Sequence, residues 1–346
     1  MMTNMTRRIL QVTTACTALM AGSALWADER PAAMIIAQGG LGDGSWNDTA
    51  NAGFQSGLEK TGVEGRTIES ADVAAQGEEI MRRAADGGFG LVISLEWIHG
   101  EPMEVLAKDY PDTNWVIMNQ TRTGDNIASV VFGEHEGSFL AGALAAQVTT
   151  DTSIEGINAD ATIGVIGGFK APGIDKFIVG YIQGAKAVNP DIEVKVAYAD
   201  SFGDPAKGLQ MANAMFDEGA DIVYQVAGGT GIGIIEAAKA RGHYAIGVDS
   251  DQDGMAPGNV LTSMVKRVDV AVDEIVTGYA ADNFPGGEVI QFGLAENGVA
   301  LSEMTHTKDK VPAAYIERVT AYKAQIIAGE LDVWDVSSQG YPDFFK

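Results

Sequence analysis

Cysteine and histidine are scarce in this chain. The sole cysteine, Cys16, lies near the N-terminus, so the rest of the chain can form no disulfide, cysteine nucleophile or cysteine metal site. The four histidines are scattered, without the spacing of a metalloprotease helix. No nucleophile elbow or phosphate-binding loop ending in Lys-Ser or Lys-Thr occurs. The sequence therefore predicts a protein that is not an enzyme and has no cofactor and no metal.

Positive charge is also scarce. The chain has 23 Lys and Arg residues against 47 Asp and Glu residues, a net charge of −24. A field of this sign repels nucleic acid, anionic lipid and nucleotide polyphosphates. We therefore expect no nucleic-acid partner, and a neutral or cationic small molecule is the better candidate ligand.

Long apolar runs are absent after the N-terminal segment. Arg7 and Arg8 precede a mostly apolar stretch, and small residues then offer a cleavage site shortly before Asp28. This pattern predicts a secretory signal peptide over residues 1–27, with an N-terminal anchor helix as the alternative. Lipidation of Cys16 is disfavoured, because 13–15 lacks the usual aliphatic residue. We expect a soluble, periplasmic, monomeric protein after export.

Strand and helix patterns alternate along the remaining chain. Buried strands that alternate with helices predict parallel sheets built from βαβ units. The expected strands are 34–37, 91–95, 115–118, 127–132, 163–166, 194–197, 222–226, 245–248, 261–265 and 289–293. The expected helices include 78–85, 139–148, 177–188, 209–216, 232–241, 268–281 and 311–329.

Two βαβ units follow each other, at about 31–133 and 134–266, and an extra helix and strand come after them. This order suggests that the chain crosses back to complete the first domain. We predict an N-terminal lobe of 28–133 plus 268–296 and a C-terminal lobe of 134–267 plus 297–346. Two doubly wound α/β domains would face each other across a cleft, and ligands bind beyond the carboxyl ends of such strands. The alternative is two independent enzyme domains in tandem.

Two loops that follow strands carry aromatic residues. In residues 39–48, glycines allow close approach of the backbone to a ligand, Trp46 offers a large ring, and Asp43 and Asn47 offer hydrogen-bonding groups. The alternative makes Ser45 the helix N-cap and Trp46 part of the core. In residues 201–205, Phe202 has little core to fill and could form a slot with Trp46.

Two further loops and one lysine complete the candidate site. Gly228 belongs to a glycine-rich loop whose spacing does not fit a dinucleotide fingerprint, and the N–H groups there are expected to hold an uncharged polar ligand. The acidic run from Asp249 lacks the glutamate of a calcium loop, because Val260 stands at the twelfth position. Asp249 instead suits a vicinal diol. Lys266 could reach the same cleft, or be a solvated surface lysine.

Four segments resemble the basic membrane protein family of ABC-transporter substrate-binding proteins, in its purine nucleoside-binding type. The resemblance covers the mature chain in order and is most specific at 129–146 and 261–269. The segments are GGLGDGSWND at 39–48, SVVFGEHEGSFLAGALAA at 129–146, GDPAKG at 203–208 and LTSMVKRVD at 261–269.

The resemblance implies a type I periplasmic-binding fold, uptake of purine nucleosides in many members and of a flavin in some, and a membrane permease as partner. It implies that Trp46 and Phe202 sandwich a base, that Asp249 and Lys266 hold the ribose, and that Gly228 lines the same wall. Asn119 stands where relatives usually carry an aspartate that contacts the base edge. The identity of the base therefore stays open, and so do a sugar, polyol or flavin ligand and an NAD-dependent oxidoreductase.

Overall fold

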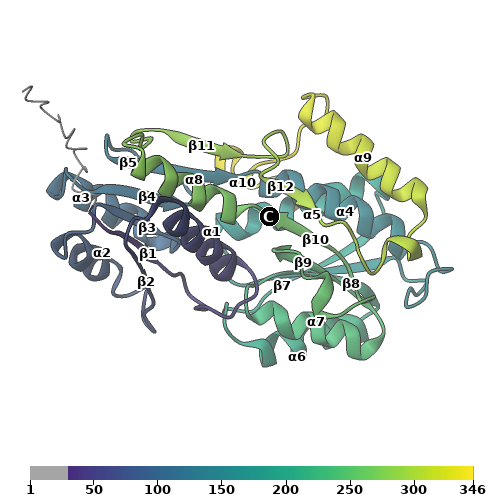
Figure 1. Ribbon diagram of the computed structural model, residues 1–346. Coiled ribbons are helices and arrows are strands. Elements are labelled where there is room, and N and C mark those ends of the chain that lie inside the picture. The colour runs from purple at the N-terminus through teal and green to yellow at the C-terminus, as the bar shows by residue number, and fades with distance from the viewer. Residues whose placement is uncertain (1–29, 346) are drawn as a thin grey trace, which may run out of the picture.

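The computed structural model describes residues 30–345, and its chain folds into two α/β domains that lie side by side (Figure 1). The predicted signal peptide and Cys16 lie outside the described residues. The strand order is β11-β5-β4-β3-β1-β2 in the first sheet and β12-β10-β9-β8-β6-β7 in the second. The paired strands run parallel, apart from the antiparallel pairing of β12 with β10. The expected pair of doubly wound parallel sheets is confirmed.

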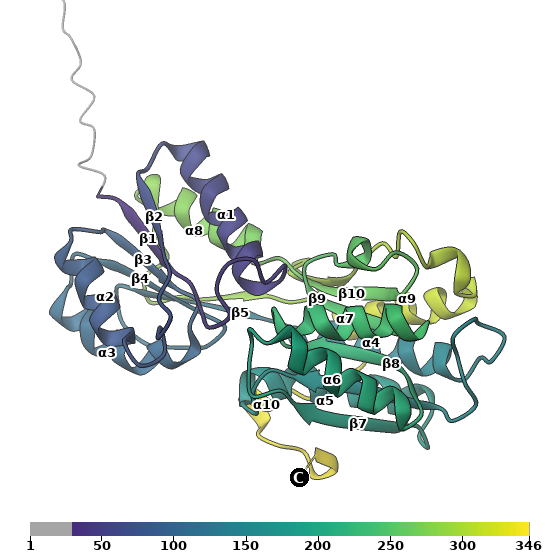
Figure 2. The ribbon, with the colours of Figure 1, turned by 90° about the horizontal axis from the view of Figure 1, so that it is seen from below.

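Helices cover both faces of the first sheet (Figure 2). Helices α1 and α8 pack together closely because Gly53 of α1 has no side chain. A Cβ at this position would lie 2.1 Å from the Asp269 carbonyl oxygen. The elements of this domain are β1 (Ala32–Ile35), α1 (Trp46–Thr61), β2 (Gly65–Ile68), α2 (Gly77–Asp86), β3 (Leu91–Ser94), α3 (Gly100–Asp109), β4 (Asn114–Met118), β5 (Ile127–Phe132), α8 (Val268–Ala280) and β11 (Val289–Phe292).

The second domain repeats this arrangement, with α4, α5 and α9 on one face and α6 and α7 on the other. A Cβ at Gly142 would lie 2.0 Å from the Tyr181 carbonyl oxygen, so glycine lets α4 and α5 touch. The elements are α4 (Glu134–Thr149), β6 (Thr162–Gly167), α5 (Pro172–Val188), β7 (Glu193–Tyr198), α6 (Pro205–Asp217), β8 (Ala220–Val226), α7 (Thr230–Arg241), β9 (Tyr244–Asp249), β10 (Val260–Lys266), β12 (Val299–Leu301), α9 (Ala313–Ile327) and α10 (Val336–Gln339).

Within residues 30–345 the chain passes between the two sheets three times: after β5, after β10 and between β11 and β12. Backbone hydrogen bonds tie these crossings together. The Gly133 N–H donates to the Phe292 carbonyl oxygen at 2.9 Å, and the Arg267 N–H donates to the Gly298 carbonyl oxygen at 2.8 Å. The crossings therefore form one hydrogen-bonded band beneath the space between the domains.

Several elements differ from the sequence-based prediction. Strands β2 and β12 and helix α3 were missed: β2 is a half-exposed strand at a sheet edge, β12 has three residues, and α3 contains Pro102 in its first turn. Helix α4 starts at Glu134, five residues before the predicted 139, which brings a carboxylate to the domain junction. No helix within residues 30–345 has the length and apolar character needed to cross a bilayer.

Candidate ligand-binding cleft

A cleft of about 630 Å³ lies between the domains, at the carboxyl ends of strands from both sheets. The cleft wall includes all the residues that the sequence analysis selected. They are Asp43, Trp46, Asn47, Asn119, Phe202, Gly228, Asp249 and Lys266.

Asp43 organises the loop before α1. One of its carboxylate oxygens accepts the Ser45 N–H at 2.9 Å, and the other accepts the Asn47 N–H at 2.9 Å. Burial raises the pKa of Asp43, although these backbone N–H groups oppose the shift. Asp43 therefore satisfies the first amides of the helix. Ser45 stands at the N-cap position, as the alternative interpretation has it, but its side chain makes no capping hydrogen bond.

Asn47 is almost fully buried and binds the preceding part of the same loop. Its side-chain oxygen accepts the Ala37 N–H at 2.9 Å, and its nitrogen donates to the Gly40 carbonyl oxygen at 3.1 Å. Both polar atoms are thus engaged by the protein. Asp43 and Asn47 fix the path of the loop and thereby the position of Trp46.

Trp46 is the first residue of α1, and its ring is held by two neighbours. Its indole stands edge-on to the Phe132 ring, with ring centres 6.4 Å apart and planes at 82°. The Lys266 Nζ atom lies 4.2 Å from the centre of the indole, a cation–π contact. Phe132 and Lys266 therefore hold the indole in place.

Phe202 lies in the loop after β7, on the other domain. Its ring packs on Gly168, where a Cβ would come within 2.1 Å of it, and on the Phe169 ring at 5.3 Å. Phe169 also lines the cleft and was missed, because the sequence around it has no motif. Gly39 of the first domain, with φ of 100°, lies close to Phe202. A Cβ added to Gly39 would be 3.0 Å from the Phe202 carbonyl oxygen.

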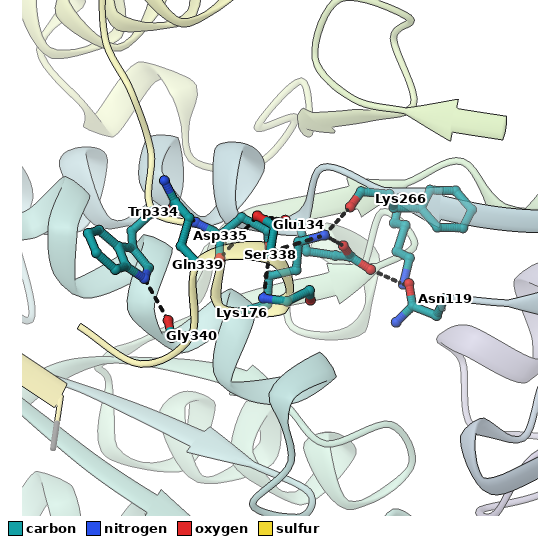
Figure 3. A network of polar contacts seen from close by, with 11 residues as sticks. Asn119, Glu134, Lys176, Lys266, Trp334, Asp335, Ser338, Gln339 and Gly340 are labelled. Atoms are coloured by element: carbon teal, nitrogen blue, oxygen red, sulfur yellow. Dashed lines mark hydrogen bonds and ion pairs between the residues drawn. The ribbon is translucent and has the colours of Figure 1, made fainter. Parts of the chain in front are cut away.

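Lys266 is buried at the base of the cleft, so the alternative of a solvated lysine is wrong. We call the buried charged residues Lys266, Glu134 and Lys176 the cleft floor. Its Nζ atom is 2.8 Å from a Glu134 carboxylate oxygen and donates to Asn119 Oδ1 at 3.2 Å. Asn119 has a left-handed φ of 67°, which asparagine tolerates better than most residues. This polar contact joins the two domains (Figure 3).

Glu134 binds two lysines at once. Its second oxygen is 3.1 Å from Lys176 Nζ, which also donates to the Phe132 carbonyl oxygen at 2.6 Å. Burial alone would raise the pKa of Glu134, but Lys176 and Lys266 outweigh burial and lower it to about 2. Neither Glu134 nor Lys176 was among the residues predicted from the sequence. The position of Glu134 directly after a buried strand was the available signal.

Asp249 connects the cleft floor to the other domain. Its carboxylate accepts the Ser45 hydroxyl at 2.5 Å, and the neighbouring Ser250 hydroxyl donates to the Gly44 carbonyl oxygen at 2.7 Å. Burial raises the pKa of Asp249, and Lys266 opposes that shift. The two domains are thus in direct contact through their loops.

The glycine-rich loop does not offer the amides expected of it. The Thr230 N–H donates to the Phe202 carbonyl oxygen at 3.2 Å, and those of Gly231 and Ile232 donate to carbonyl oxygens of the same loop. The expectation that this helix start holds a ligand through its N–H groups is therefore wrong for these three amides. Gly228 lines the cleft with φ of 53°, beside Phe202.

The loop from Asp249 onwards and the 204–205 dipeptide serve the protein's own structure. Asp253 accepts the Ser302 hydroxyl at 3.1 Å and the Thr305 N–H at 3.1 Å. No cluster of three or more metal-ligating side chains is found in the described part of the chain. Asp204 accepts the Lys207 N–H at 3.0 Å and caps α6.

Two α/β domains joined by three crossings, with a cleft between the carboxyl ends of their strands, form the type I periplasmic-binding fold. The family described as ABC transporter substrate-binding protein PnrA-like matches residues 31–336. The chain belongs to this family and is an ABC transporter solute-binding protein. The family consists of transport components and not of enzymes, which sets aside the NAD-dependent alternative.

Named relatives share about a third of the sequence. The chain is 33% identical over 323 residues to the CD4+ T-cell-stimulating antigen of Listeria innocua, with 87% of each chain covered. It is 32% identical to the ABC transporter nucleoside-binding protein BmpA of Lactococcus lactis subsp. cremoris, with 87% of this chain and 88% of that protein covered. A solved ABC transporter solute-binding protein from Aeropyrum pernix K1 superposes with a TM-score of 0.81 at 26% identity, covering 89% and 95% of the two chains.

Proposed function

We propose that this protein binds a nucleoside or a related planar heterocycle, with a purine as the preferred base, and delivers it to an ABC-transporter permease. The observation that carries the proposal is that Trp46 and Phe202, from different domains, line one cleft above a buried polar floor. The name of the Lactococcus relative, a nucleoside-binding protein, supports the same ligand class.

Each wall has a role in this proposal. Trp46 and Phe202 stack on the two faces of the base, and each stack is worth roughly 1–3 kcal/mol. A micromolar complex needs about 8 kcal/mol, so two stacks supply a substantial part of it. Asp249 and Lys266 hold the polar sugar, and Asn119 contacts the edge of the base. Gly228 keeps the wall beside Phe202 free of a side chain.

Asp43 and Asn47 act indirectly in this proposal. Their polar atoms bind the loop that carries Trp46, so they position the ring and leave few groups for the ligand. Removal of either side chain should weaken binding by displacing Trp46.

We also propose how the whole chain works. The lobes comprise 28–133 plus 268–296 and 134–267 plus 297–346, and they close on the ligand by a hinge motion at the three crossings. The protein is exported by a signal peptide, works as a monomer in the periplasm, and presents the closed lobes to the permease.

A thermal-shift screen of nucleosides, free bases, flavins and sugars tests the ligand class. A ligand that binds the folded protein raises its melting temperature, so nucleosides should give the largest shifts. A shift with sugars or polyols and none with any aromatic heterocycle would contradict the proposal. Mass spectrometry of protein purified without denaturation provides an independent check, because a tightly bound ligand is retained.

A further inference from the structure

The last residues that the structure describes, 334–345, form a segment that we call the C-terminal strap. It follows α9, includes α10 and lies beside α5 (Figure 2). The Trp334 indole N–H donates to the Gly340 carbonyl oxygen at 2.7 Å and closes the strap into a compact turn (Figure 3). The family match ends at residue 336, so most of the strap lies beyond it.

The strap is anchored to α5 at several points. The Trp334 N–H donates to Gln183 Oε1 at 2.9 Å, and the Tyr341 hydroxyl donates to Asp175 Oδ2 at 2.7 Å. Asp175 is fully buried, whereas Tyr341 is 38% exposed, so this hydrogen bond ties an exposed side chain of the strap to a buried carboxylate of α5. The Lys170 ammonium lies over the Phe345 ring, 4.9 Å from its centre. These contacts hold the strap in one position.

The strap also forms part of the cleft wall. Asp335, Ser337 and Ser338 line the cleft next to Lys176. The Asp335 carboxylate is 3.8 Å from Lys176 Nζ, whose other partners are Glu134 and a backbone carbonyl oxygen. Asp335 therefore holds the place beside this ammonium that an anionic group of a ligand would take.

We propose that the C-terminal strap is a selectivity element, in which Asp335 excludes phosphate-bearing ligands from the Lys176 end of the cleft. An anion that entered there would meet the Asp335 carboxylate at short range, and the two negative charges would repel each other. The nucleoside identity of the accepted ligand rests on the function proposed above. The exclusion of anions does not.

Two variants separate charge from position. Asp335→Asn removes the charge but keeps a side-chain oxygen for the Ser337 N–H, which Asp335 accepts at 2.9 Å in α10. A chain that ends at Gln339 keeps Asp335 but lacks the Tyr341 anchor. Glu330→Gln is the matched control, because Glu330 is exposed, lies outside the cleft and undergoes the same change of charge.

Calorimetric titration with adenosine and adenosine 5′-monophosphate measures the selectivity. In the Asp335→Asn variant, we expect the affinity for the monophosphate relative to adenosine to rise about tenfold over wild type. The shortened chain should change in the same direction, and Glu330→Gln should match wild type. An equal ratio in all four proteins overturns the proposal while leaving nucleoside binding intact.

Inorganic phosphate gives a readout that needs no nucleoside. Phosphate should raise the melting temperature of Asp335→Asn and of the shortened chain at concentrations that leave wild type and Glu330→Gln unchanged. If no nucleoside binds any variant, the proposed function fails and the phosphate comparison alone decides the role of the strap. Equal phosphate responses in all four proteins would then overturn it.

Discussion

The two walls of the cleft use their polar side chains in different ways. On the first domain, Asp43 and Asn47 bind their own loop backbone and leave the Trp46 ring as the main feature presented to the cleft. On the second domain, Glu134 and Lys266 bind each other, and Lys266 also donates to Asn119 of the first domain. The first wall thus presents one ring held by its own loop, whereas the second combines the Phe202 ring with a buried ion pair. Shape should determine affinity for a flat ligand, whereas the charged floor should determine stability and polar selectivity.

The charged floor should give the largest effect on stability. Glu134→Gln keeps the size of the side chain but leaves Lys176 and Lys266 without their shared anion. Breaking a buried ion pair in this way costs about 3–5 kcal/mol, measured as the free energy of unfolding in urea. Glu79→Gln is the control, since it breaks an exposed pair with Arg83 and should cost less than about 1 kcal/mol. Equal losses of unfolding free energy in the two variants would show that the buried ion pairs of Glu134 stabilise the protein no more than an exposed pair does.

The same carboxylate predicts a pH dependence. The folded-state pKa of Glu134 is about 2, below its ordinary value of 4.5. Its contribution to stability is therefore complete above about pH 4.5 and is lost as the pH falls through about 2. As the pH falls over this window, the free energy of unfolding in urea should decrease more steeply for wild type than for Glu134→Gln. Parallel curves would argue against an ionised Glu134.

The aromatic rings should give the largest effect on affinity. Trp46→Ala and Phe202→Ala each remove one stacking face, worth roughly 1–3 kcal/mol, and should weaken nucleoside binding about tenfold or more. Calorimetric titration measures the loss. Trp46→Phe retains a ring and should keep most of the affinity. Unchanged affinity in both alanine variants would remove these rings from the site.

Asp43 tests whether the first wall is a scaffold. Asp43→Ala removes the acceptor for the first amides of α1 and should lower stability by about 0.5–2 kcal/mol, with a parallel loss of affinity. Asp43→Asn keeps an acceptor oxygen and should lose less of both. A loss of affinity without a change in melting temperature would instead assign Asp43 a direct contact with the ligand.

Asn119 should give the smallest effect. Its oxygen accepts from Lys266, which leaves its amide nitrogen as the donor group, and Asn119→Asp removes that donor. We expect a change of about 1 kcal/mol in the preference among bases, with adenosine and inosine compared by titration. Identical preferences in wild type and variant would place Asn119 away from the base.

Much of the fold was predictable because local patterns determine it. Buried strands such as β3 and β8 are short apolar runs between helical patterns, and the return of the chain to its first sheet through β11 followed from the extra helix and strand. The edge strand β2 is half-exposed and β12 is very short, so neither produces a clear pattern.

The residues predicted from the sequence all line the cleft, but their bonding to one another was not predictable. The predicted residues lie at or beyond the carboxyl ends of strands, and parallel strands bring these ends together. That rule could not reveal that Asp43 caps a helix or that Glu134 pairs with Lys176, because both depend on side-chain contacts. The contribution of Asp335, from the far end of the chain, has no local signal at all.

Gly39 gives the cleft a mechanical limit. Gly39 has no side chain, and a Cβ at this position would lie only 3.0 Å from the Phe202 carbonyl oxygen of the other domain. A larger residue at position 39 would therefore push the first-domain loop away from Phe202 and widen the space between the two rings.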